Sequence, residues 1–413
     1  MKILMNKLIA GTLVLLLHIC LLNSCSEPLP EIGLKPGIWR GELVAQENTI
    51  PFNFEVDKTD GSYSIKLING NEKLDIDAVD ILGDSLFFNM HIFDISIKAK
   101  IYKDSLVGSY IKNYADNYIL PFRAVHGKKG RFDQMNSSDK FDGTWETVFT
   151  DNSGKETDAV GIFKKEDSLL IGTFLTKTGD YRFLDGYTVK DTMYLFTFDG
   201  NHIFRFKAFV ENDSLLKGEY WSGKTGYKTF VSQKNDTVEL PDPNSLTYLK
   251  EGYDSIDFSF PDLDGNLTSL KNDKYKDKIV ILQILGTWCP NCMDETRFLS
   301  EWYKKNSSRG VEIIGLAYEV KPDFDYAKNR VLTMKQKMDV PYDFLIAGTS
   351  TTESASASLP MLNKVISFPT SIIIDKKGKV RRIHTGFNGP ATGIFYERFV
   401  EDFNEFMNEL INE

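Results

Sequence analysis

Two cysteines three positions apart, Cys289 and Cys292, have the type and spacing of residues that carry out redox chemistry. They stand in Trp288-Cys289-Pro290-Asn291-Cys292, between an apolar run and a stretch of helical periodicity. Pro290 suits the first position of that helix, because its missing N–H needs no partner there. The N-terminus of a helix favours a thiolate at Cys289, and Cys292 lies one turn further, near enough to resolve a mixed disulfide. The pattern predicts thiol–disulfide exchange with both cysteines as catalytic residues.

Three other uses of a close cysteine pair fit the sequence less well. A disulfide across so short a loop adds little stability through chain entropy, which argues against a purely structural bond. A zinc site needs two further ligands at close spacing, and the sequence offers no second Cys-x-x-Cys and no pair of histidines. Peroxiredoxins need Pro and Thr at positions that hold Leu282 and Gly286 here. We therefore expect a redox pair that uses no metal and no cofactor.

The cysteine pair lies in a C-terminal region in which strands and helices are predicted to alternate. Continuous apolar runs indicate buried strands, and apolar residues at helical spacing indicate helices. The expected strands are Ile279–Leu285, Val311–Ala317, Ser371–Ile374 and Lys379–His384, and the expected helices are Met293–Lys305, Tyr326–Met338 and Ile394–Ile411. This alternation predicts a mixed sheet covered by helices, with Cys289 where a buried strand passes into a helix.

Residues 35–128 and 141–235 are predicted to be two copies of one small β-domain. Three landmarks recur in the same order at a nearly constant offset of about 107 residues. They are Gly37-Ile38-Trp39 with Gly143-Thr144-Trp145, Asp84-Ser85-Leu86 with Asp191-Thr192-Met193, and Asp104-Ser105-Leu106 with Asp213-Ser214-Leu215. Short alternating runs between turn pairs predict about eight antiparallel strands per copy, in a barrel or sandwich. A linker follows at 233–251, with a short helix expected at Ser245–Glu251.

The composition of the chain bounds its class. Of the 413 residues, 42% are hydrophobic and 26% are charged, which argues against a disordered, collagen-like or polytopic membrane protein. The length suits two to four domains of about 100–200 residues. The formal net charge of −9 disfavours nucleic-acid partners, because phosphate contacts need clustered Lys and Arg.

The first 25 residues have the pattern of an export signal. Lys2 and Lys7 form a basic start, and Leu8 to Leu22 is almost wholly apolar but short for a membrane span. The sequence Leu22-Asn23-Ser24-Cys25 resembles a bacterial lipobox. We therefore expect residues 1–24 to be a lipoprotein signal peptide and Cys25 to become a lipidated N-terminus. A transmembrane anchor is the alternative.

From about Ile256 to the C-terminus the chain resembles the TlpA-type, thioredoxin-fold thiol–disulfide oxidoreductases of the bacterial cell envelope. The matching segments are Phe258–Gly265, Gly286–Cys292, Phe368-Pro369-Thr370, Gly378-Lys379-Val380 and Gly386–Pro390, in the order of the family. The resemblance implies that residues 252–413 form a thioredoxin-like domain. The expected fold is therefore multidomain, with two tandem antiparallel β-barrel or sandwich repeats followed by an α/β thioredoxin fold.

The resemblance also implies roles for residues around the cysteines. Pro369 would be a cis-proline facing the disulfide, and the backbone of Phe368 would be offered to an extended partner peptide. Glu295 matches a family glutamate proposed to line the active-site cavity and manage protons, and Trp288 and Pro290 belong to the cysteine motif itself. Beyond the family roles, Gln283 is expected to be a hydrogen-bonded core amide, and Asp294 a surface residue of the helix.

The function expected from these features is that of a protein disulfide oxidoreductase, acting as a reductase or isomerase on exported proteins. The resemblance implies an electron donor in the membrane as a second partner. The lipid anchor predicts a membrane-attached protein of the bacterial cell envelope that faces the periplasm.

A different class of function stays open. In this alternative the chain is a ligand-binding envelope lipoprotein whose β-domains bind a glycan, a peptide or a lipid, with an accessory redox domain. An aromatic pocket within one β-copy would favour it, and filled barrel interiors would not. In the main interpretation, the β-domains set the distance between the anchor and the active site, and the thioredoxin-like fragment folds and reduces insulin without them.

Overall fold

The structure is a computed structural model that describes residues 33–76, 79–133 and 136–413. The expected signal peptide, 1–24, and the lipidation site, Cys25, lie outside the described residues. Within those three ranges, no helix is both long enough and apolar enough to cross a membrane.

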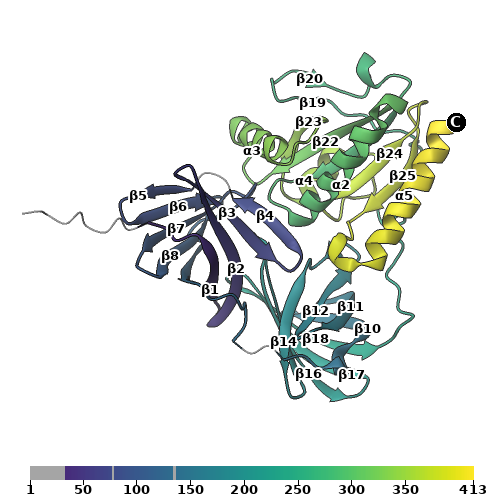
Figure 1. Cartoon of the computed structure of the whole chain (residues 1–413). Helices are drawn as coiled ribbons and strands as arrows, with labels where there is room; N and C mark the ends of the chain where they lie inside the picture. Colours follow the sequence, from purple (N-terminus) through teal and green to yellow (C-terminus); the bar gives the residue numbers. More distant parts are fainter. Residues whose placement is uncertain (1–32, 77–78, 134–135) are drawn as a thin grey trace, which may run out of the picture. The chain divides into compact units, whose positions relative to one another are not determined.

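Strands β1 to β9 form one antiparallel sheet in the order β4-β3-β2-β1-β9-β8-β7-β6-β5 (Figure 1). Their bounds are β1 Gly37–Ala45, β2 Asn48–Thr59, β3 Ser62–Asn69, β4 Glu72–Ile76, β5 Asp80–Leu82, β6 Ser85–Asn89, β7 Ile95–Ile101, β8 Ser105–Lys112 and β9 Ile119–His126. Buried and exposed side chains alternate along strands such as β4 and β7, so one face of the sheet carries the apolar core. Among the described residues, β4 and β5 are the two edges of this sheet.

Strands β10 to β18 form a second antiparallel sheet, which closes into a barrel because β11 pairs with both β10 and β12. Their bounds are β10 Gly143–Asp151, β11 Glu156–Glu166, β12 Leu169–Thr176, β13 Gly179–Asp180, β14 Leu184–Val189, β15 Thr192–Phe198, β16 Ile203–Asn212, β17 Leu215–Ser222 and β18 Gly226–Lys234. A 3-10 turn, η1 Asp139–Phe141, precedes the barrel. Aromatic side chains fill the interior, among them Trp145, Phe149, Phe163, Phe174, Phe206 and Phe230.

The two sheets repeat one local structure, as the sequence predicted. The indole N–H of Trp39 in β1 donates to the carbonyl oxygen of Lys35 at 2.8 Å, and that of Trp145 in β10 donates to Phe141 over the same distance. The copies differ in closure, and the open sheet packs on the barrel through Phe52 and Phe198, whose ring centroids are 4.3 Å apart.

The C-terminal region is a mixed five-stranded sheet in the order β23-β22-β21-β24-β25. The strands are β21 Ile279–Leu285, β22 Val311–Glu319, β23 Asp343–Thr349, β24 Thr370–Ile374 and β25 Val380–Thr385, and a short hairpin, β19 Phe260–Pro261 with β20 Leu267–Thr268, precedes them. The helices are α2 Pro290–Asn306, α3 Phe324–Lys337, α4 Thr352–Ser358 and α5 Ile394–Asn412, with 3-10 turns η2 Asp273–Tyr275, η3 Ser307–Arg309 and η4 Pro390–Thr392.

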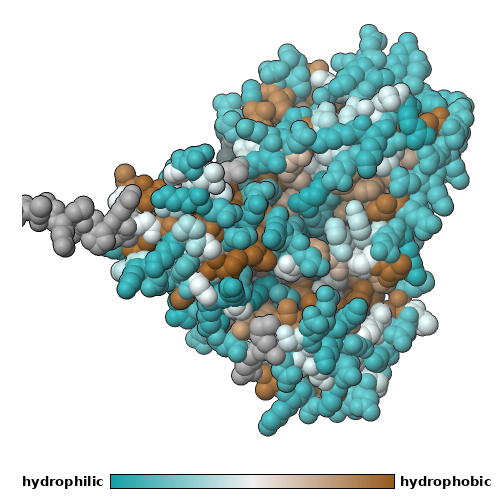
Figure 2. Space-filling view, in the orientation of Figure 1, coloured by the Kyte–Doolittle hydropathy of each residue, from teal (hydrophilic) through white to brown (hydrophobic). Residues whose placement is uncertain are grey.

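Strand β21 separates two apolar layers because its side chains point alternately to opposite faces of the sheet. Ile279, Ile281 and Leu285 pack with residues of α2, α3 and α5, whereas Val280, Leu282 and Ile284 pack with residues of α4. Gln283 falls on the first of these faces, which directs its polar side chain toward α2. The view in Figure 2 is mostly hydrophilic with smaller apolar patches, as this division between buried and exposed faces requires.

The multidomain fold class predicted from the sequence is confirmed, with local differences. Residues Ser245–Glu251 do not form the expected helix; Leu249 instead makes an antiparallel bridge to Leu362. The sequence analysis also did not predict β23 or α4. The Ala- and Ser-rich stretch of α4 shows little apolar periodicity, and β23 reads Asp-Phe-Leu-Ile-Ala-Gly-Thr, with a short apolar run.

Candidate active site

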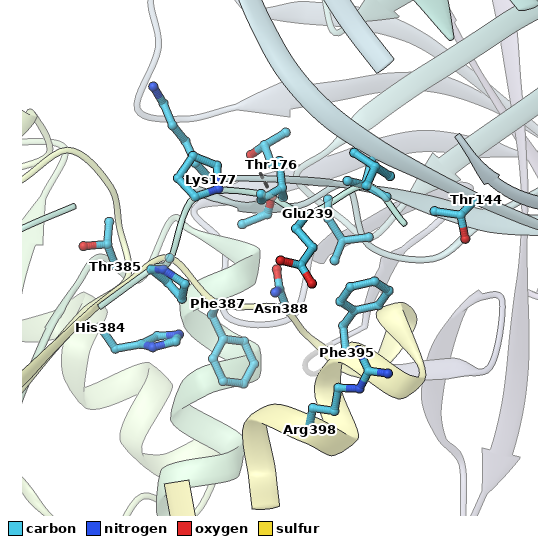
Figure 3. Close-up of a pocket in the computed structure, with 18 of the residues that line it drawn as sticks. Thr144, Thr176, Lys177, Glu239, His384, Thr385, Phe387, Asn388, Phe395 and Arg398 are labelled. Carbon is cyan, nitrogen blue, oxygen red and sulfur yellow. Dashed lines mark hydrogen bonds between the residues drawn. The ribbon is translucent and has the colours of Figure 1, made fainter. Parts of the chain in front are cut away.

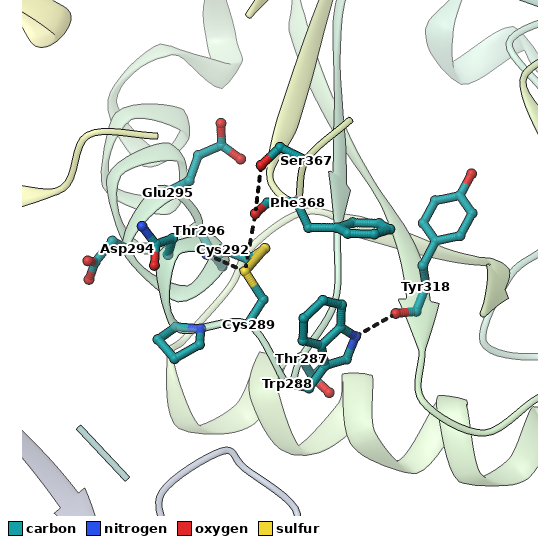
Figure 4. Close-up of a disulfide and its surroundings, with 12 residues drawn as sticks. Thr287, Trp288, Cys289, Cys292, Asp294, Glu295, Thr296, Tyr318, Ser367 and Phe368 are labelled. Carbon is teal, nitrogen blue, oxygen red and sulfur yellow. Dashed lines mark hydrogen bonds between the residues drawn. A yellow bond between two sulfur atoms is a disulfide. The ribbon is translucent and has the colours of Figure 1, made fainter. Parts of the chain in front are cut away.

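Cys289 and Cys292 lie where the chain passes from β21 into α2, and they form a disulfide with Cα atoms 5.2 Å apart (Figure 4). Cys289 is the N-cap residue of α2, and its Sγ accepts a hydrogen bond from the backbone N–H of Cys292 at 3.1 Å. Pro290 occupies the first helical position. Cys289 is 6% exposed and Cys292 is 1% exposed. A partner can therefore approach Cys289 more readily than Cys292.

The loop before β24 faces the disulfide, and its peptide bond between Phe368 and Pro369 is cis. The carbonyl oxygen of Phe368 lies 3.5 Å from Sγ of Cys289. A disulfide sulfur carries no proton, so this contact can become a hydrogen bond only when reduced Cys289 has a thiol to donate. The cis bond and its place beside the sulfur are what the resemblance implies for Pro369.

The segment that leads into the disulfide is fixed to β22. The indole N–H of Trp288 donates to the carbonyl oxygen of Tyr318 at 2.9 Å, and its ring meets Phe368 edge-on with centroids 5.5 Å apart. Thr287 donates both its backbone N–H and its hydroxyl to the buried carboxylate of Glu319, each at 2.8 Å. These contacts hold the indole against the loop that contains Phe368, and Figure 4 shows its hydrogen bond to Tyr318.

Glu295 lies on α2 and is 2% exposed. Its carboxylate oxygens accept hydrogen bonds from the carboxamide of Gln283 at 2.9 Å and the hydroxyl of Ser371 at 2.8 Å. Burial raises the pKa of this carboxyl to about 7, although both hydrogen bonds favour the charged form. Gln283 also accepts from the hydroxyl of Tyr342 at 2.9 Å, so it is a hydrogen-bonded core amide, as expected. Glu295 can thus gain or lose a proton near neutral pH inside the domain.

Asp294 is not the surface residue that the sequence predicted. It is 6% exposed and pairs with Arg182, which lies between β13 and β14 of the barrel and is 1% exposed. The same guanidinium donates to both carboxylate oxygens of Glu72 in β4 at 2.7 Å and lies 2.9 Å from the carboxylate of Asp199. Burial raises the pKa of Asp294 to about 7. Sequence reasoning missed this cluster because its pairs join positions 110 and 112 residues apart, which no local pattern marks.

The barrel contributes one side of the candidate active site. The carboxamide of Asn201 donates to the carbonyl oxygen of Trp288 at 2.6 Å, and that of Asn291 donates to the carbonyl oxygen of Asp180 at 3.0 Å. A cavity of about 280 Å³ lies at this junction. Its lining includes Cys289, Trp288 and Phe368 from the redox region and Tyr181, His202 and Phe204 from the barrel. The sequence analysis did not predict this side, because the hydrogen bonds that form it join residues 87 and 111 positions apart.

A second cavity, of about 320 Å³, lies beside α5 and is lined by neither cysteine (Figure 3). Figure 3 shows Lys177, Glu239, Phe387, Phe395 and Arg398 around it. His384 also lines it, but burial lowers the pKa of this imidazole to about 4, so the side chain is neutral at physiological pH. Of these two cavities, only the smaller one is lined by a cysteine, Cys289.

Comparisons with known proteins match the same region. Residues 250–394 match the Redoxin family. The chain is 33% identical over 129 residues to the thiol-disulfide oxidoreductase ResA of Bacillus thuringiensis subsp. konkukian, a match that covers 31% of this chain and 66% of that protein. It is 27% identical over 164 residues to ResA of Geobacillus thermodenitrificans, covering 40% of this chain and 79% of that protein.

Among solved structures, a thiol:disulfide interchange protein of the thioredoxin family from Chlorobium tepidum TLS is 21% identical, with a TM-score of 0.30 over 39% of this chain and 98% of that one. The Redoxin match contains both cysteines and the cis-proline, and it begins after the last strand of the barrel.

Proposed function

We propose that this chain, whose C-terminal part belongs to the thioredoxin-like thiol–disulfide oxidoreductases, exchanges electrons between its Cys289–Cys292 pair and the cysteines of exported proteins. The observation that carries the proposal is the disulfide at the N-terminus of α2, beneath a cis-proline loop. A sulfur at a helix N-terminus is stabilised as a thiolate, which is the form that attacks disulfides.

The exchange needs two steps. In the reduced protein, the Cys289 thiolate attacks one sulfur of a partner disulfide; the partner S–S bond breaks, a mixed disulfide forms, and the other partner sulfur leaves and takes up a proton. The Cys292 thiolate then attacks Sγ of Cys289, which releases the second partner sulfur as a thiol. Two electrons and two protons have passed to the partner, and the pair has the disulfide form seen in the structure.

Proton movement in the second step has a candidate group in Glu295. The residue lies on the same helix as Cys292, three positions further along, and is buried at a pKa of about 7. A carboxyl poised near the working pH can accept the proton that Cys292 must lose before it attacks. We propose Glu295 as the proton acceptor for the resolving thiol.

The direction of exchange and the partners follow from the family resemblance and the N-terminal sequence. We assign the chain to reduction or isomerisation, with a membrane dithiol donor that returns two electrons after each cycle. The lipobox-like sequence at Cys25 supports a lipid-anchored protein of the bacterial envelope that faces the periplasm.

The ligand-binding alternative has less support. The barrel interior is filled by aromatic side chains; the rings of Phe149 and Phe174, for example, lie 5.1 Å apart. The rings that fill the interior leave no volume there for a glycan, peptide or lipid. A cavity of about 540 Å³ does open within the barrel domain, but most of its lining beside Tyr181, Tyr220 and Tyr227 consists of polar residues. We therefore retain the redox function for the whole chain.

Trapping of reaction partners tests the proposal. Cys292→Ser keeps the attacking sulfur and removes the resolving one, so cells that express it should accumulate mixed disulfides with exported proteins. Non-reducing gels and mass spectrometry would identify these adducts, and dithiothreitol should reduce them and release the partner proteins. The matched control is the double variant Cys289→Ser/Cys292→Ser. Equal adduct levels in the two variants would contradict the proposed exchange.

A further inference from the structure

The hairpin between β12 and β13 of the barrel reaches the two segments that flank Cys289. On one side, the hydroxyl of Ser367, just before the cis-proline loop, donates to the carbonyl oxygen of Thr178 at 2.8 Å. On the other, the carboxamide of Asn291 donates to the carbonyl oxygen of Asp180 at 3.0 Å. Thr178 and Asp180 are two residues apart, so one hairpin tip bridges the cis-proline loop and the first turn of α2.

This hairpin is held in place by buried polar contacts. One carboxylate oxygen of Asp180 accepts from the backbone N–H of Gly389 at 2.6 Å, and the other accepts from that of Arg182 at 2.6 Å. The guanidinium of Arg182 in turn donates to the carbonyl oxygen of Pro290 at 2.9 Å. Within the tip, the hydroxyl of Thr176 donates to the carbonyl oxygen of Gly179 at 2.8 Å. These contacts fix the hairpin tip in its position beside Cys289.

The bridge leaves little room beside the sulfur. Cys289 is 6% exposed, and the cavity beside it measures about 280 Å³, near the lower end of the range for small-ligand sites. Barrel residues Tyr181, His202 and Phe204 line its far side. An extended peptide with a cysteine in its middle must continue in both directions from the attacked sulfur. The hairpin lies between the cis-proline loop and the first turn of α2, so it blocks one of these two directions.

We propose that the β12–β13 hairpin is a specificity-determining element that restricts Cys289 to disulfides whose attacked sulfur is carried at the end of a chain. Such a sulfur enters the cavity end-on and needs chain on one side only. This inference rests on the proposed function, because it specifies the substrate class for the same two-step exchange.

Gly179 offers a substitution that loosens the attachment of the hairpin to α2. Its φ of +130° favours glycine, and a Cβ there would lie 2.8 Å from Nδ2 of Asn291. Gly179→Ala should therefore strain the backbone of the tip and displace the Asn291 carboxamide, which breaks its hydrogen bond to Asp180. Gly154→Ala is the matched control, since Gly154 has a φ of +81°, lies in the hairpin between β10 and β11 of the same barrel, and has open space around its Cβ position.

Two peptides of identical composition provide the assay, one with its cysteine at the C-terminus and one with it in the middle, each as a mixed disulfide with the chromogenic thiol 2-nitro-5-thiobenzoate. Release of the chromophore by the full, reduced protein in a single turnover measures attack by Cys289. The wild type should react with the terminal-cysteine peptide at least about tenfold faster, and Gly179→Ala should narrow that ratio severalfold. Gly154→Ala should keep the wild-type ratio.

The outcomes distinguish a failure of the proposed exchange from a failure of the proposed selectivity. If neither peptide reacts faster with the wild type than with Cys289→Ser, the proposed exchange itself fails. If both react but at equal rates in the wild type, the exchange stands and the hairpin does not select. Should Gly179→Ala not fold by circular dichroism, Ser367→Ala/Asn291→Ala removes both side-chain hydrogen bonds that join the hairpin tip to the segments flanking Cys289, and an unchanged ratio there would overturn the inference.

Discussion

The guanidinium of Arg182 donates a hydrogen bond of 2.9 Å to the carbonyl oxygen of Pro290, the residue that follows Cys289. One side chain of the barrel is thereby joined to the active-site turn of the redox region. The same guanidinium pairs with Glu72 of the first sheet and with Asp294 of α2. Arg182 thus connects all three parts of the chain, so both β-domains contribute to the contacts that hold the active-site turn.

The first prediction concerns this buried cluster. Arg182→Met removes the buried guanidinium that Glu72, Asp199 and Asp294 share, and among the described residues leaves them only Arg297 and His202 as ion-pair partners. Removing one partner of a buried pair costs about 3 to 5 kcal/mol. Urea denaturation should show that loss in the free energy of unfolding. Arg123→Met is the control, because Arg123 pairs with Glu42 while 61% exposed and should cost about 1 kcal/mol or less. Similar decreases in the free energy of unfolding in the two variants would show that the buried cluster does not stabilise the folded chain.

The second prediction concerns the charge of Glu295. The folded protein holds this carboxyl at a pKa of about 7, above its ordinary 4.5, so unfolding between these values releases a proton. The free energy of unfolding should therefore fall as pH rises from about 4.5 to 7, by an amount of the order of 3 kcal/mol from this group. Glu295→Gln lacks that contribution, and Asp294 titrates in both proteins.

Denaturant titrations of the wild type and Glu295→Gln across this range would test the effect. The stability of the variant relative to the wild type should increase through the window and level off above about pH 7. A difference that does not depend on pH would mean that Glu295 is charged throughout.

The third prediction concerns the two sulfurs in the reduced protein. Cys289 caps α2 and receives the backbone N–H of Cys292, whereas Cys292 is 1% exposed. Iodoacetamide should therefore modify Cys289 at neutral pH faster than it modifies a free thiol, with Cys292 reacting much more slowly. Peptide mapping by mass spectrometry after timed quenching measures both rates. Faster labelling of Cys292 would reverse the assignment of attacker and resolver.

The fourth prediction concerns the anchor. Cys25→Ala should release the protein from membrane fractions or block its maturation, because stable attachment needs acyl chains and Cys25 is the expected acceptor. Fractionation after a high-salt wash gives the measurement, with Cys20→Ala as a control that leaves the acceptor intact. A Cys25→Ala protein that remains on the membrane would argue for the transmembrane alternative.

The sequence predicted the features that depend on local pattern. The strand Ile279–Leu285 is placed as expected, and the helix that begins at Pro290 follows from the proline and the apolar spacing after it. It could not predict that Asp294 is buried, because a carboxylate on an amphipathic helix looks solvent-exposed until its cation, Arg182, is known. The second copy closes into a barrel because β11 pairs with β12, whereas the first copy stays an open sheet. The two copies have similar local sequence patterns, so the sequence did not predict this difference in strand pairing.

The last prediction concerns the redox region on its own. The sequence places its start near residue 252, but the preceding segment packs on the same region: Lys250 donates its backbone N–H to Met361, and Thr385 donates its own to Pro243. A fragment that begins at Asp242 should therefore be more stable than one that begins at Gly252, as thermal unfolding would show. Without the barrel hairpin, the longer fragment should reduce insulin at least as fast as the full chain, since the groove beside Cys289 is then open on both sides. If that fragment were folded by circular dichroism yet inactive toward insulin, the barrel would have to supply part of the catalytic machinery, and its role would be more than selection among substrates.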